Sequence, residues 1–376
     1  MLCLKNINCE KLRENIEKRM AKDLAECNVN GVSVLVMQDG KTVYRNIFGL
    51  ASNDSLYRMA SMTKPVTAVA VMTLYDKKLL SIDDPVEKYL PEFSDLYIAE
   101  VDDNNDIIKS SHVKNIPTIK HLLTHTSGIL AGRSGAAYLE KMAPEDDRTL
   151  SSAVKFYSEC GLDFEPFSKQ EYSGTAAFDV LAKIVETVSG QDYNEYLQQH
   201  IFRPLNMKDT TFVPSQDQWN RIIPMHDRIN GHNAEGITYK GCVFEKTPVT
   251  HYLGGAGLIS SLEDYSAFAN MLLGEGELSG TRILSEDSVK LISQAHVPRE
   301  IMDMRERWGL GVRVITQENY KLPVGTFGWS GAYGTHFWVD PKNMITAVYL
   351  KNSRFDGGSG AVTSENFESD VFNSLE

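Results

Sequence analysis

The sequence predicts a mixed α/β protein: an antiparallel sheet assembled from both ends of the chain, flanked by helices, with a mainly helical domain inserted. Residues that favour strands gather near both ends, and helical periodicity dominates the middle. Asp39-Gly40 separates the first two strand-forming runs, and glycine accepts the positive φ of a tight hairpin turn. We therefore expect residues 1–90 and 285–376 to form the sheet domain and residues 91–284 the inserted domain.

In the first third of the chain we expect a helix, a β-hairpin, a second helix and a loop, in this order. An amphipathic helix is expected within residues 1–26, because apolar residues recur every four positions, at Leu12, Ile16, Met20 and Leu24. The hairpin follows, with strands at Val32–Met37 and Thr42–Phe48. Residues 61–80 form a pattern that is apolar on nearly all sides, which predicts a buried helix. Residues 101–115 are polar and rich in turn formers, which predicts an exposed loop.

The remaining elements are expected from the same patterns. Helices are predicted at Thr118–Leu123, Thr149–Cys160, Thr175–Ser189, Tyr193–Ile201, Leu262–Leu273, Glu286–Gln294 and about Val362–Ser374. Strands are predicted at about Trp308–Ile315, Gly325–Trp329, Thr335–Val339 and Met344–Leu350.

Composition excludes several classes of protein. The 376 residues carry a formal net charge of −12, which argues against nucleic-acid binding and against docking on an anionic membrane. Five cysteines without a Cys-x-x-Cys pair argue against disulfides and a zinc site, so we expect free thiols. The N-terminus lacks the apolar core of a signal peptide, and the longest apolar stretch is too short to span a bilayer. We therefore expect a cytoplasmic protein; its oligomeric state is left open.

A search for reactive motifs leaves one nucleophile pattern, Ser-x-x-Lys. The sequence contains no Gly-x-Ser-x-Gly, no His-Glu-x-x-His and no glycine-rich phosphate loop, so we expect no cofactor. His121 and His125 are four residues apart, but without an acidic companion they indicate packing or capping residues rather than metal ligands, and we expect no metal. Ser-x-x-Lys occurs three times, at Ser61–Lys64, Ser111–Lys114 and Ser152–Lys155.

Context favours Ser61 over the other two serines. Ser111 lies in the polar segment and Ser152 on a surface-like helix, whereas Ser61 begins the helix that is expected to be buried. Residues i and i+3 share a helix face, so the Lys64 amine can reach the Ser61 hydroxyl. The helix N-terminus favours a developing oxyanion, and burial disfavours the ammonium form of a lysine. These features predict a nucleophilic serine with a lysine base.

Two later segments complete a candidate site. Tyr172-Ser173-Gly174 lies where a loop enters a long helix, and a tyrosine can relay a proton; the alternative is a helix-capping aromatic residue. Tyr44 is a weak rival because strand alternation explains it. Trp329-Ser330-Gly331 lies on a predicted strand, where glycines indicate either a close approach of substrate to the backbone or a bulge.

In this order, Ser61-Met62-Thr63-Lys64, Tyr172-Ser173-Gly174 and Trp329-Ser330-Gly331 resemble the three motifs of the serine β-lactamase/penicillin-binding-protein superfamily. The chain is most similar to the class C β-lactamase-like branch, which includes the family VIII carboxylesterases. The resemblance covers about residues 30–350, with support from HLLTHTSGI (121–129), PLNMKDTTF (204–212) and GGAGLISSLEDYSAFANMLL (254–273). It implies a β-lactamase/transpeptidase-like fold.

The resemblance also implies roles for individual residues. Ser61 would form an acyl-enzyme, Lys64 would accept its proton or tune it, and Tyr172 would share the base role and activate the deacylating water. The backbone N–H groups of Ser61 and Ala332 would form the oxyanion hole. The remaining segments would contact the substrate, through Gly174, Trp329, Ser330, Gly331 and Tyr333.

Two departures from the lactamase motifs favour esters. Gly174 stands where the lactamases have Asn, and Trp329 where they have a Lys suited to a carboxylate. Family VIII esterases resemble this chain in having that Trp. We therefore expect a serine carboxylesterase acting on small or short-chain esters. A β-lactamase or D-amino-acid peptidase of the same mechanism, which would act on amides, and a non-catalytic scaffold remain alternatives.

Overall fold

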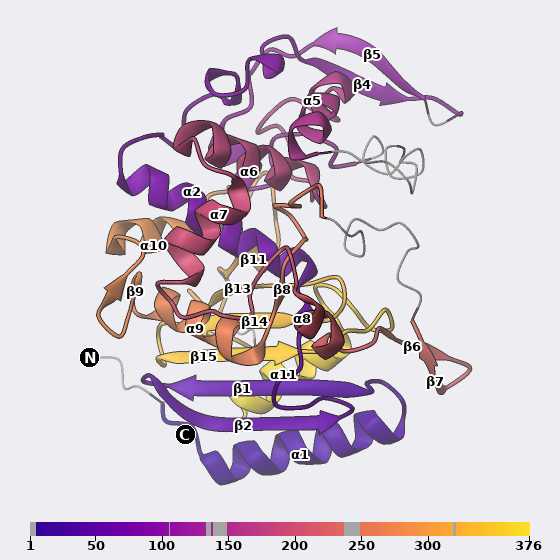
Figure 1. The fold of residues 1–376 in the computed structure, drawn as a ribbon, viewed down its shortest axis with the longest axis vertical. Coiled ribbons are helices and arrows are strands. Elements are labelled where there is room, and N and C mark those ends of the chain that lie inside the picture. Colours follow the sequence, from indigo (N-terminus) through magenta and orange to yellow (C-terminus); the bar gives the residue numbers. More distant parts are fainter. Residues whose placement is uncertain (1–4, 105, 133–136, 138–148, 237–248, 319–320) are drawn as a thin grey trace.

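The fold is built around one antiparallel sheet whose strands come from both ends of the chain (Figure 1). The computed structural model describes residues 5–104, 106–132, 137, 149–236, 249–318 and 321–376. The strand order is β11-β12-β13-β14-β15-β1-β2. Its members are β1 (Gly31–Gln38), β2 (Lys41–Gly49), β11 (Glu306–Trp308), β12 (Arg313–Ile315), β13 (Phe327–Ser330), β14 (His336–Asp340) and β15 (Ile345–Leu350). This arrangement confirms the predicted fold class.

The two ends of the chain join where β1 pairs with β15, next to the edge strand β2. Val34 opposes Tyr349, and Val36 opposes Ala347, so β-favouring residues from both ends share one buried ladder. The predicted hairpin between β1 and β2 is also present. Asp39 and Gly40 both have positive φ, which is the conformation that a two-residue hairpin turn requires.

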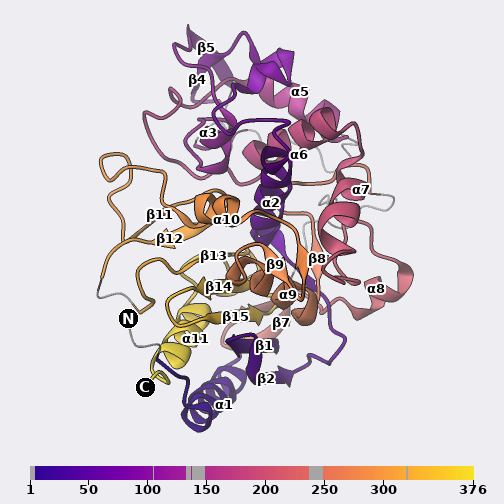
Figure 2. The same ribbon diagram turned by 90° about the vertical axis from the view of Figure 1, so that its left-hand side faces the viewer.

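Helices cover both faces of the sheet (Figure 2). On one face, α1 (Cys9–Ala25) and α11 (Val362–Phe372) bury Leu12, Ile16 and Phe367 against alternate strand residues such as Val34 and Trp338. On the other face lie α9 (Leu262–Leu273), α2 (Thr63–Asp76) and α10 (Glu286–Ser293), within the larger apolar core.

Helical elements of the middle of the chain pack beyond α2, which lies at the centre of the molecule. They are α3 (Ile119–Leu123), α5 (Leu150–Cys160), α6 (Ala176–Ser189), α7 (Tyr193–Leu197) and the π-helical turn Gln198–Phe202. Helix α8 (Gln216–Arg221) also comes from the middle of the chain but lies at the level of the sheet (Figure 1). Helix α9 comes from within 91–284 and yet packs on β14 and β15. The division into 1–90 with 285–376 and 91–284 stays a prediction.

Short hairpins and strand pairs account for the remaining strands. The pairs are β3 (Tyr57–Arg58) with β8 (Ile259–Ser260), β4 (Tyr97–Val101) with β5 (Ile107–His112), β6 (His226–Ile229) with β7 (His232–Glu235), and β9 (Glu277–Leu278) with β10 (Thr281–Arg282). The β4–β5 pair corrects one expectation, because much of the polar segment 101–115 is a hairpin rather than a loop. Polar side chains suit β5, whose described side chains are exposed to water.

Two further expectations need correction. The strand expected at Trp308–Ile315 is two strands, β11 and β12, which turn at Gly311, a residue with positive φ. The helix expected at Tyr193–Ile201 changes from α to π geometry after Leu197. Of the five cysteines, Cys9, Cys27 and Cys160 form no disulfide, and Cys3 and Cys242 lie outside the described residues. Within the described segments, no helix is long and apolar enough to cross a membrane.

Candidate active site

Ser61 and Lys64 meet at the N-terminal end of the buried helix α2. Ser61 lies in a short 3₁₀ turn, Ala60–Met62, which leads directly into α2, so the helix begins two residues later than expected. Ala60 has φ of +47°, a conformation that strains a residue with a Cβ atom and that occurs often beside functional residues. Ser61 is half-buried, whereas Lys64 is fully buried.

The Lys64 Nζ atom has three oxygen neighbours. It lies 2.5 Å from the Gly174 carbonyl oxygen, 2.8 Å from the Gly255 carbonyl oxygen and 3.2 Å from Ser61 Oγ. The two carbonyls accept two N–H groups, so the third position on the nitrogen faces the serine hydroxyl. In the ammonium form this position carries a proton, and in the amine form it carries a lone pair that can accept the hydroxyl proton.

Tyr172 lies beside this pair, in the loop before α6. Its ring centroid is 4.9 Å from Lys64 Nζ, and its hydroxyl accepts a hydrogen bond of 3.4 Å from Trp329 Nε1. Between these described residues, no hydrogen bond joins the Tyr172 hydroxyl to Ser61 or Lys64. The structure therefore brings the amine and the serine hydroxyl into contact and places the phenol next to them. Tyr44, the rival, lies on β2 as expected.

An open cavity of about 380 Å³ connects the three sequence motifs. Much of its wall is apolar: the ring of Tyr172 stacks on Trp308, and Trp308 meets Trp329 edge to face with their centroids 4.5 Å apart. Half of the Met304 side chain is exposed at this wall. The lining is formed by Ser61, Gln170, Tyr172, Met302, Met304, Glu306, Arg307, Trp308, Arg313, Trp329, Ser330, Ala332, Gly358 and Ser359.

Some of the predicted substrate-contacting residues line the cavity and others do not. Trp329, Ser330 and Ala332 line the cavity, and Gly174 contributes its carbonyl to Lys64. Gly331 and Tyr333 are not part of the lining.

Gly331 is explained by packing. A Cβ atom there would lie 2.3 Å from the Met59 carbonyl oxygen and 2.1 Å from Thr335 Oγ1, so only glycine lets the backbone approach these two groups. The pairing of β13 with β14 keeps its register through Ser330, so this glycine is explained by close packing and not by a bulge.

His121 and His125 have different structural roles. His121 completes the capping box of α3, where its Nδ1 accepts from the Thr118 backbone. His125 is buried against Tyr172 and Trp308, and its Nδ1 accepts from the Ser173 backbone. Burial and the nearby Lys64 lower the pKa of His125 well below its usual value, so the ring is neutral. Across the described ranges, no group of three or more His, Cys, Asp or Glu could hold a metal ion.

A buried polar chain lies behind the third motif and was missed by sequence reasoning. Ser330 Oγ is 2.8 Å from His336 Nδ1, and His336 Nε2 is 3.0 Å from Glu368 Oε1. Arg313 forms ion pairs with both Glu368 and Glu306. The sequence did contain a signal for this chain of contacts, because charged residues stand within apolar strand and helix patterns. Buried charges are rarely found without partners, so these residues could have been expected to pair.

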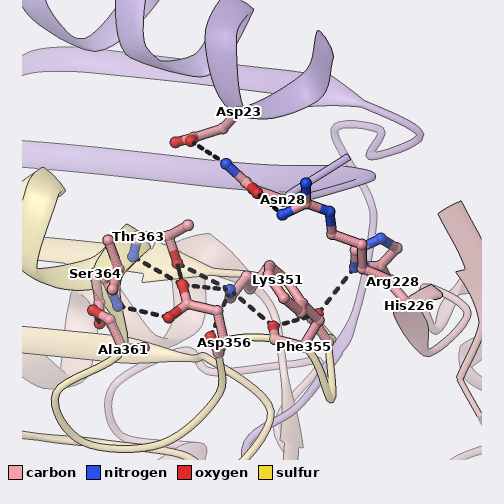
Figure 3. Close-up of polar contacts among 12 residues, drawn as sticks. Asp23, Asn28, His226, Arg228, Lys351, Phe355, Asp356, Ala361, Thr363 and Ser364 are labelled. Atoms are coloured by element: carbon pink, nitrogen blue, oxygen red, sulfur yellow. Dashed lines mark hydrogen bonds and ion pairs between the residues drawn. The ribbon is translucent and has the colours of Figure 1, made fainter. Parts of the chain in front are cut away.

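One wall of the cavity depends on a second buried ion pair (Figure 3). Gly358 and Ser359 reach the cavity on the loop between β15 and α11. Lys351 Nζ donates to the Asp356 carbonyl oxygen at 2.7 Å and to Thr363 Oγ1 at 2.8 Å. The Asp356 carboxylate in turn accepts from the backbone N–H groups of Val362 and Thr363, at the start of α11. Burial lowers the pKa of Lys351 to about 8, although Asp356 opposes the shift.

Asp356→Asn should destabilise the fold by about 3 kcal/mol, because it leaves the buried Lys351 without its counter-charge. Urea denaturation at pH 7 measures the change in the free energy of unfolding. The matched control is Asp303→Asn, which removes a carboxylate from the exposed Arg299–Asp303 pair and should change stability by less than about 1 kcal/mol. Equal effects of the two variants would contradict the role given to Asp356.

Comparisons with known proteins find a matching family model and several similar proteins. The family model named Beta-lactamase matches residues 12–366. Esterase EstB of Burkholderia gladioli is 28% identical over 394 residues, which cover 95% of this chain and 95% of that protein. Penicillin-binding protein 4 of Amycolatopsis lactamdurans is 28% identical over 363 residues, which cover 93% of this chain and 86% of that protein.

A solved structure is also similar over nearly its whole length. EstCE1, described as a hydrolase with promiscuous acyltransferase activity, superposes with a TM-score of 0.82 and covers 97% of this chain and 99% of that one. The sequence identity is 22%, so this likeness concerns the fold alone.

Proposed function

The chain belongs to the beta-lactamase family of hydrolases, and from that premise we propose that it is a carboxylesterase that acts through an acyl-enzyme on Ser61. The observation that carries the proposal is the contact between Lys64 Nζ and Ser61 Oγ in the wall of the cavity. A buried amine that touches a serine hydroxyl at a helix N-terminus is an arrangement suited to nucleophilic catalysis.

In the first half-reaction, Ser61 Oγ attacks the ester carbonyl carbon while the Lys64 amine takes the hydroxyl proton. The carbonyl oxygen becomes an oxyanion, which the N–H groups of Ser61 and Ala332 stabilise. Ala332 suits this role because it lines the cavity and, among the described residues, no acceptor is recorded for its N–H. The C–O bond to the alcohol then breaks, and the leaving oxygen receives the proton from Lys64.

In the second half-reaction, water attacks the acyl-Ser61 carbonyl, and Tyr172 together with Lys64 takes the water proton. Collapse of this intermediate releases the carboxylic acid and returns the proton to Ser61. The ring of Tyr172 next to Lys64 Nζ supports this shared role, because catalytic hydrogen bonds commonly tighten only when substrate is bound.

The cavity wall supports esters as substrates. Trp308, Trp329 and Tyr172 form an aromatic wall, and the exposed Met304 extends the apolar surface. Such a surface suits apolar acyl or alcohol groups. The similarity to esterase EstB over 95% of the chain supports the same substrate class.

The test compares p-nitrophenyl acetate and butyrate with nitrocefin, using kcat/KM for each. We expect the esters to be preferred and a fluorophosphonate probe to add one mass adduct, located by peptide mapping at Ser61. A preference for nitrocefin would contradict the esterase proposal, and an adduct on another serine would contradict the proposed nucleophile.

One observation favours a second candidate, a peptidase or penicillin-reactive enzyme of the same mechanism. Arg307 lines the cavity, where it donates to the Val297 carbonyl and to Thr316 Oγ1. In the described segments no carboxylate pairs with it, and guanidinium is well suited to a substrate carboxylate. The similarity to a penicillin-binding protein agrees with this candidate.

Arg307→Gln tests the second candidate. If carboxylated compounds are the substrates, the variant should lose about tenfold or more in acylation by benzylpenicillin, since charge-assisted hydrogen bonds are strong. For the proposed esterase, hydrolysis of neutral p-nitrophenyl butyrate should be unchanged. Acylation is followed by intact-protein mass spectrometry and hydrolysis by absorbance. The control is Arg282→Gln, which removes an exposed arginine from a surface ion pair outside the cavity.

A further inference from the structure

The turn between β13 and β14 carries the Ala332 N–H group, which belongs to the same peptide unit as the Gly331 carbonyl. The Gly331 carbonyl oxygen accepts two backbone hydrogen bonds, from Gly334 at 2.9 Å and from Gly358 at 3.1 Å. Because a peptide unit is planar, a fixed carbonyl oxygen also fixes the direction of the N–H on its other side. The loop that contains Gly358 therefore helps to aim the Ala332 N–H.

The same loop, residues 351–361 between β15 and α11, contacts the turn at two further points. The Ser353 N–H donates to the Tyr333 carbonyl oxygen at 2.9 Å. A Cβ atom on Gly357 would lie 2.1 Å from the Ala332 carbonyl oxygen, so the two backbones are in direct contact there. The loop thus lies along the turn on both sides of Ala332.

The buried pair of Lys351 and Asp356 fastens this loop from behind (Figure 3). The two side chains are 1% and 12% exposed, and Lys351 Nζ lies 3.5 Å from Asp356 Oδ2 and 2.7 Å from the Asp356 carbonyl oxygen. The lysine stem packs against the turn itself, because a Cβ atom on Gly334 would lie 2.1 Å from Lys351 Cε. One side chain therefore touches both the turn and the loop.

Charge makes this attachment specific. Burial lowers the pKa of Lys351 to about 8, although Asp356 opposes the shift, so the amine is mainly protonated at neutral pH. Burial would raise the pKa of Asp356, but Lys351 and hydrogen bonds from Thr363 and Val362 hold it below its usual value. Moving the loop away would leave each buried charge without its partner, which is costly. The pair therefore favours one position of the loop against the turn.

We propose that Lys351 and Asp356 are positioning residues for the oxyanion hole. They act through the Gly358 N–H and the peptide unit of Gly331 and Ala332, and they touch no reacting atom of the proposed mechanism. Their contribution is made in the transition state, because only there does the carbonyl oxygen of the ester carry the charge that Ala332 stabilises. This inference rests on the proposed function, whose oxyanion hole it extends.

The first test is the double variant Lys351→Met/Asp356→Asn. It leaves no buried charge unpaired, and methionine keeps an apolar stem against Gly334, so the fold should be retained. We expect kcat for p-nitrophenyl butyrate to fall by about tenfold or more, since complete loss of one oxyanion donor costs about 10²–10³-fold. KM should stay nearly unchanged, because the lost interaction belongs to the transition state. A folded double variant with the wild-type kcat would overturn the proposal.

The matched control removes another buried ion pair. Arg19 on α1 donates to Asp370 on α11, with Nη2 2.8 Å from Oδ1, and neither residue lines the cavity. Arg19→Met/Asp370→Asn should therefore leave kcat unchanged, whatever stability it loses in urea denaturation. Circular dichroism establishes that both double variants are folded. An equal loss of kcat in the two folded variants would show a general structural effect and overturn the positioning role.

Gly357→Ala tests the contact with the turn without removing a charge. Gly357 has no left-handed φ, so its backbone accepts alanine, but the new Cβ atom must push the loop away from the Ala332 carbonyl. We expect a lower kcat with nearly unchanged KM, as in Lys351→Met/Asp356→Asn. A wild-type kcat in this variant would contradict the proposal that the loop holds the turn.

A measurement without turnover keeps the inference separate from the proposed function. In ¹⁵N-alanine-labelled protein, the Ala332 amide signal is assigned by its absence in Ala332→Gly. It should shift in Lys351→Met/Asp356→Asn, whereas the signal of Ala70, buried in α2, should not. An unmoved Ala332 signal would overturn the inference even if esters are hydrolysed. Absence of ester hydrolysis by the wild type would instead contradict the proposed function, while the Ala332 signal would still decide whether the pair holds the turn.

Discussion

Ser61→Ala should lower kcat/KM for p-nitrophenyl butyrate by about 10⁴-fold or more, because it removes the oxygen that would form the acyl-enzyme in the proposed mechanism. The fold should be retained, since Ser61 is half-buried and its side chain makes one hydrogen bond, to Lys64. The variant should also fail to acquire a fluorophosphonate adduct. Initial rates and intact-protein masses are measured side by side on wild type and variant.

The chain supplies a matched control for Ser61. Ser111 has the same spacing to a lysine, Lys114, but both side chains are exposed on or beside β5. Ser111→Ala should leave both the ester hydrolysis and the adduct unchanged. Substantial activity in Ser61→Ala, or an equal loss in Ser111→Ala, would reject Ser61 as the nucleophile.

Lys64→Met should lower kcat/KM by about 10³-fold, within the range that a general base contributes. Methionine matches the length and flexibility of the lysine side chain but can neither accept the Ser61 proton nor donate to a carbonyl. The variant should react more slowly with the fluorophosphonate probe, although it keeps Ser61, the proposed nucleophile. It should also be less stable, because the Gly174 and Gly255 carbonyls lose a partner.

Lys155→Met is the corresponding control. Lys155 follows Ser152 at the same spacing, and both side chains are exposed on α5, so neither activity nor stability should change measurably. Circular dichroism on Lys64→Met separates lost chemistry from lost folding. A folded Lys64→Met variant would contradict the base role if it kept more than a tenth of the wild-type kcat/KM. A tenfold loss in kcat/KM corresponds to about 1.4 kcal/mol of transition-state stabilisation, which is too little for a general base.

Local patterns account for the parts of the fold that were predicted correctly. The Asp39-Gly40 turn depends on the backbone freedom of adjacent residues, and α1 depends on an apolar repeat within a single helix. The same reasoning distinguished Ser61 from Ser111 and Ser152, because the apolar pattern around each serine reports its burial. It failed for segment 101–115, since polarity reports exposure but does not distinguish an exposed loop from an exposed hairpin.

The amino-acid sequence by itself determined the hairpin, the buried helix that begins near Ser61 and the order of the three motifs along the chain. Tertiary structure decided which atoms meet at the site. Lys64 bonds the carbonyls of residues 110 and 191 positions away, and Glu368 reaches His336 from another element of the fold. Periodicity reports neighbours within a strand or a helix, whereas these contacts exist only after distant segments have packed together and buried charges have found partners.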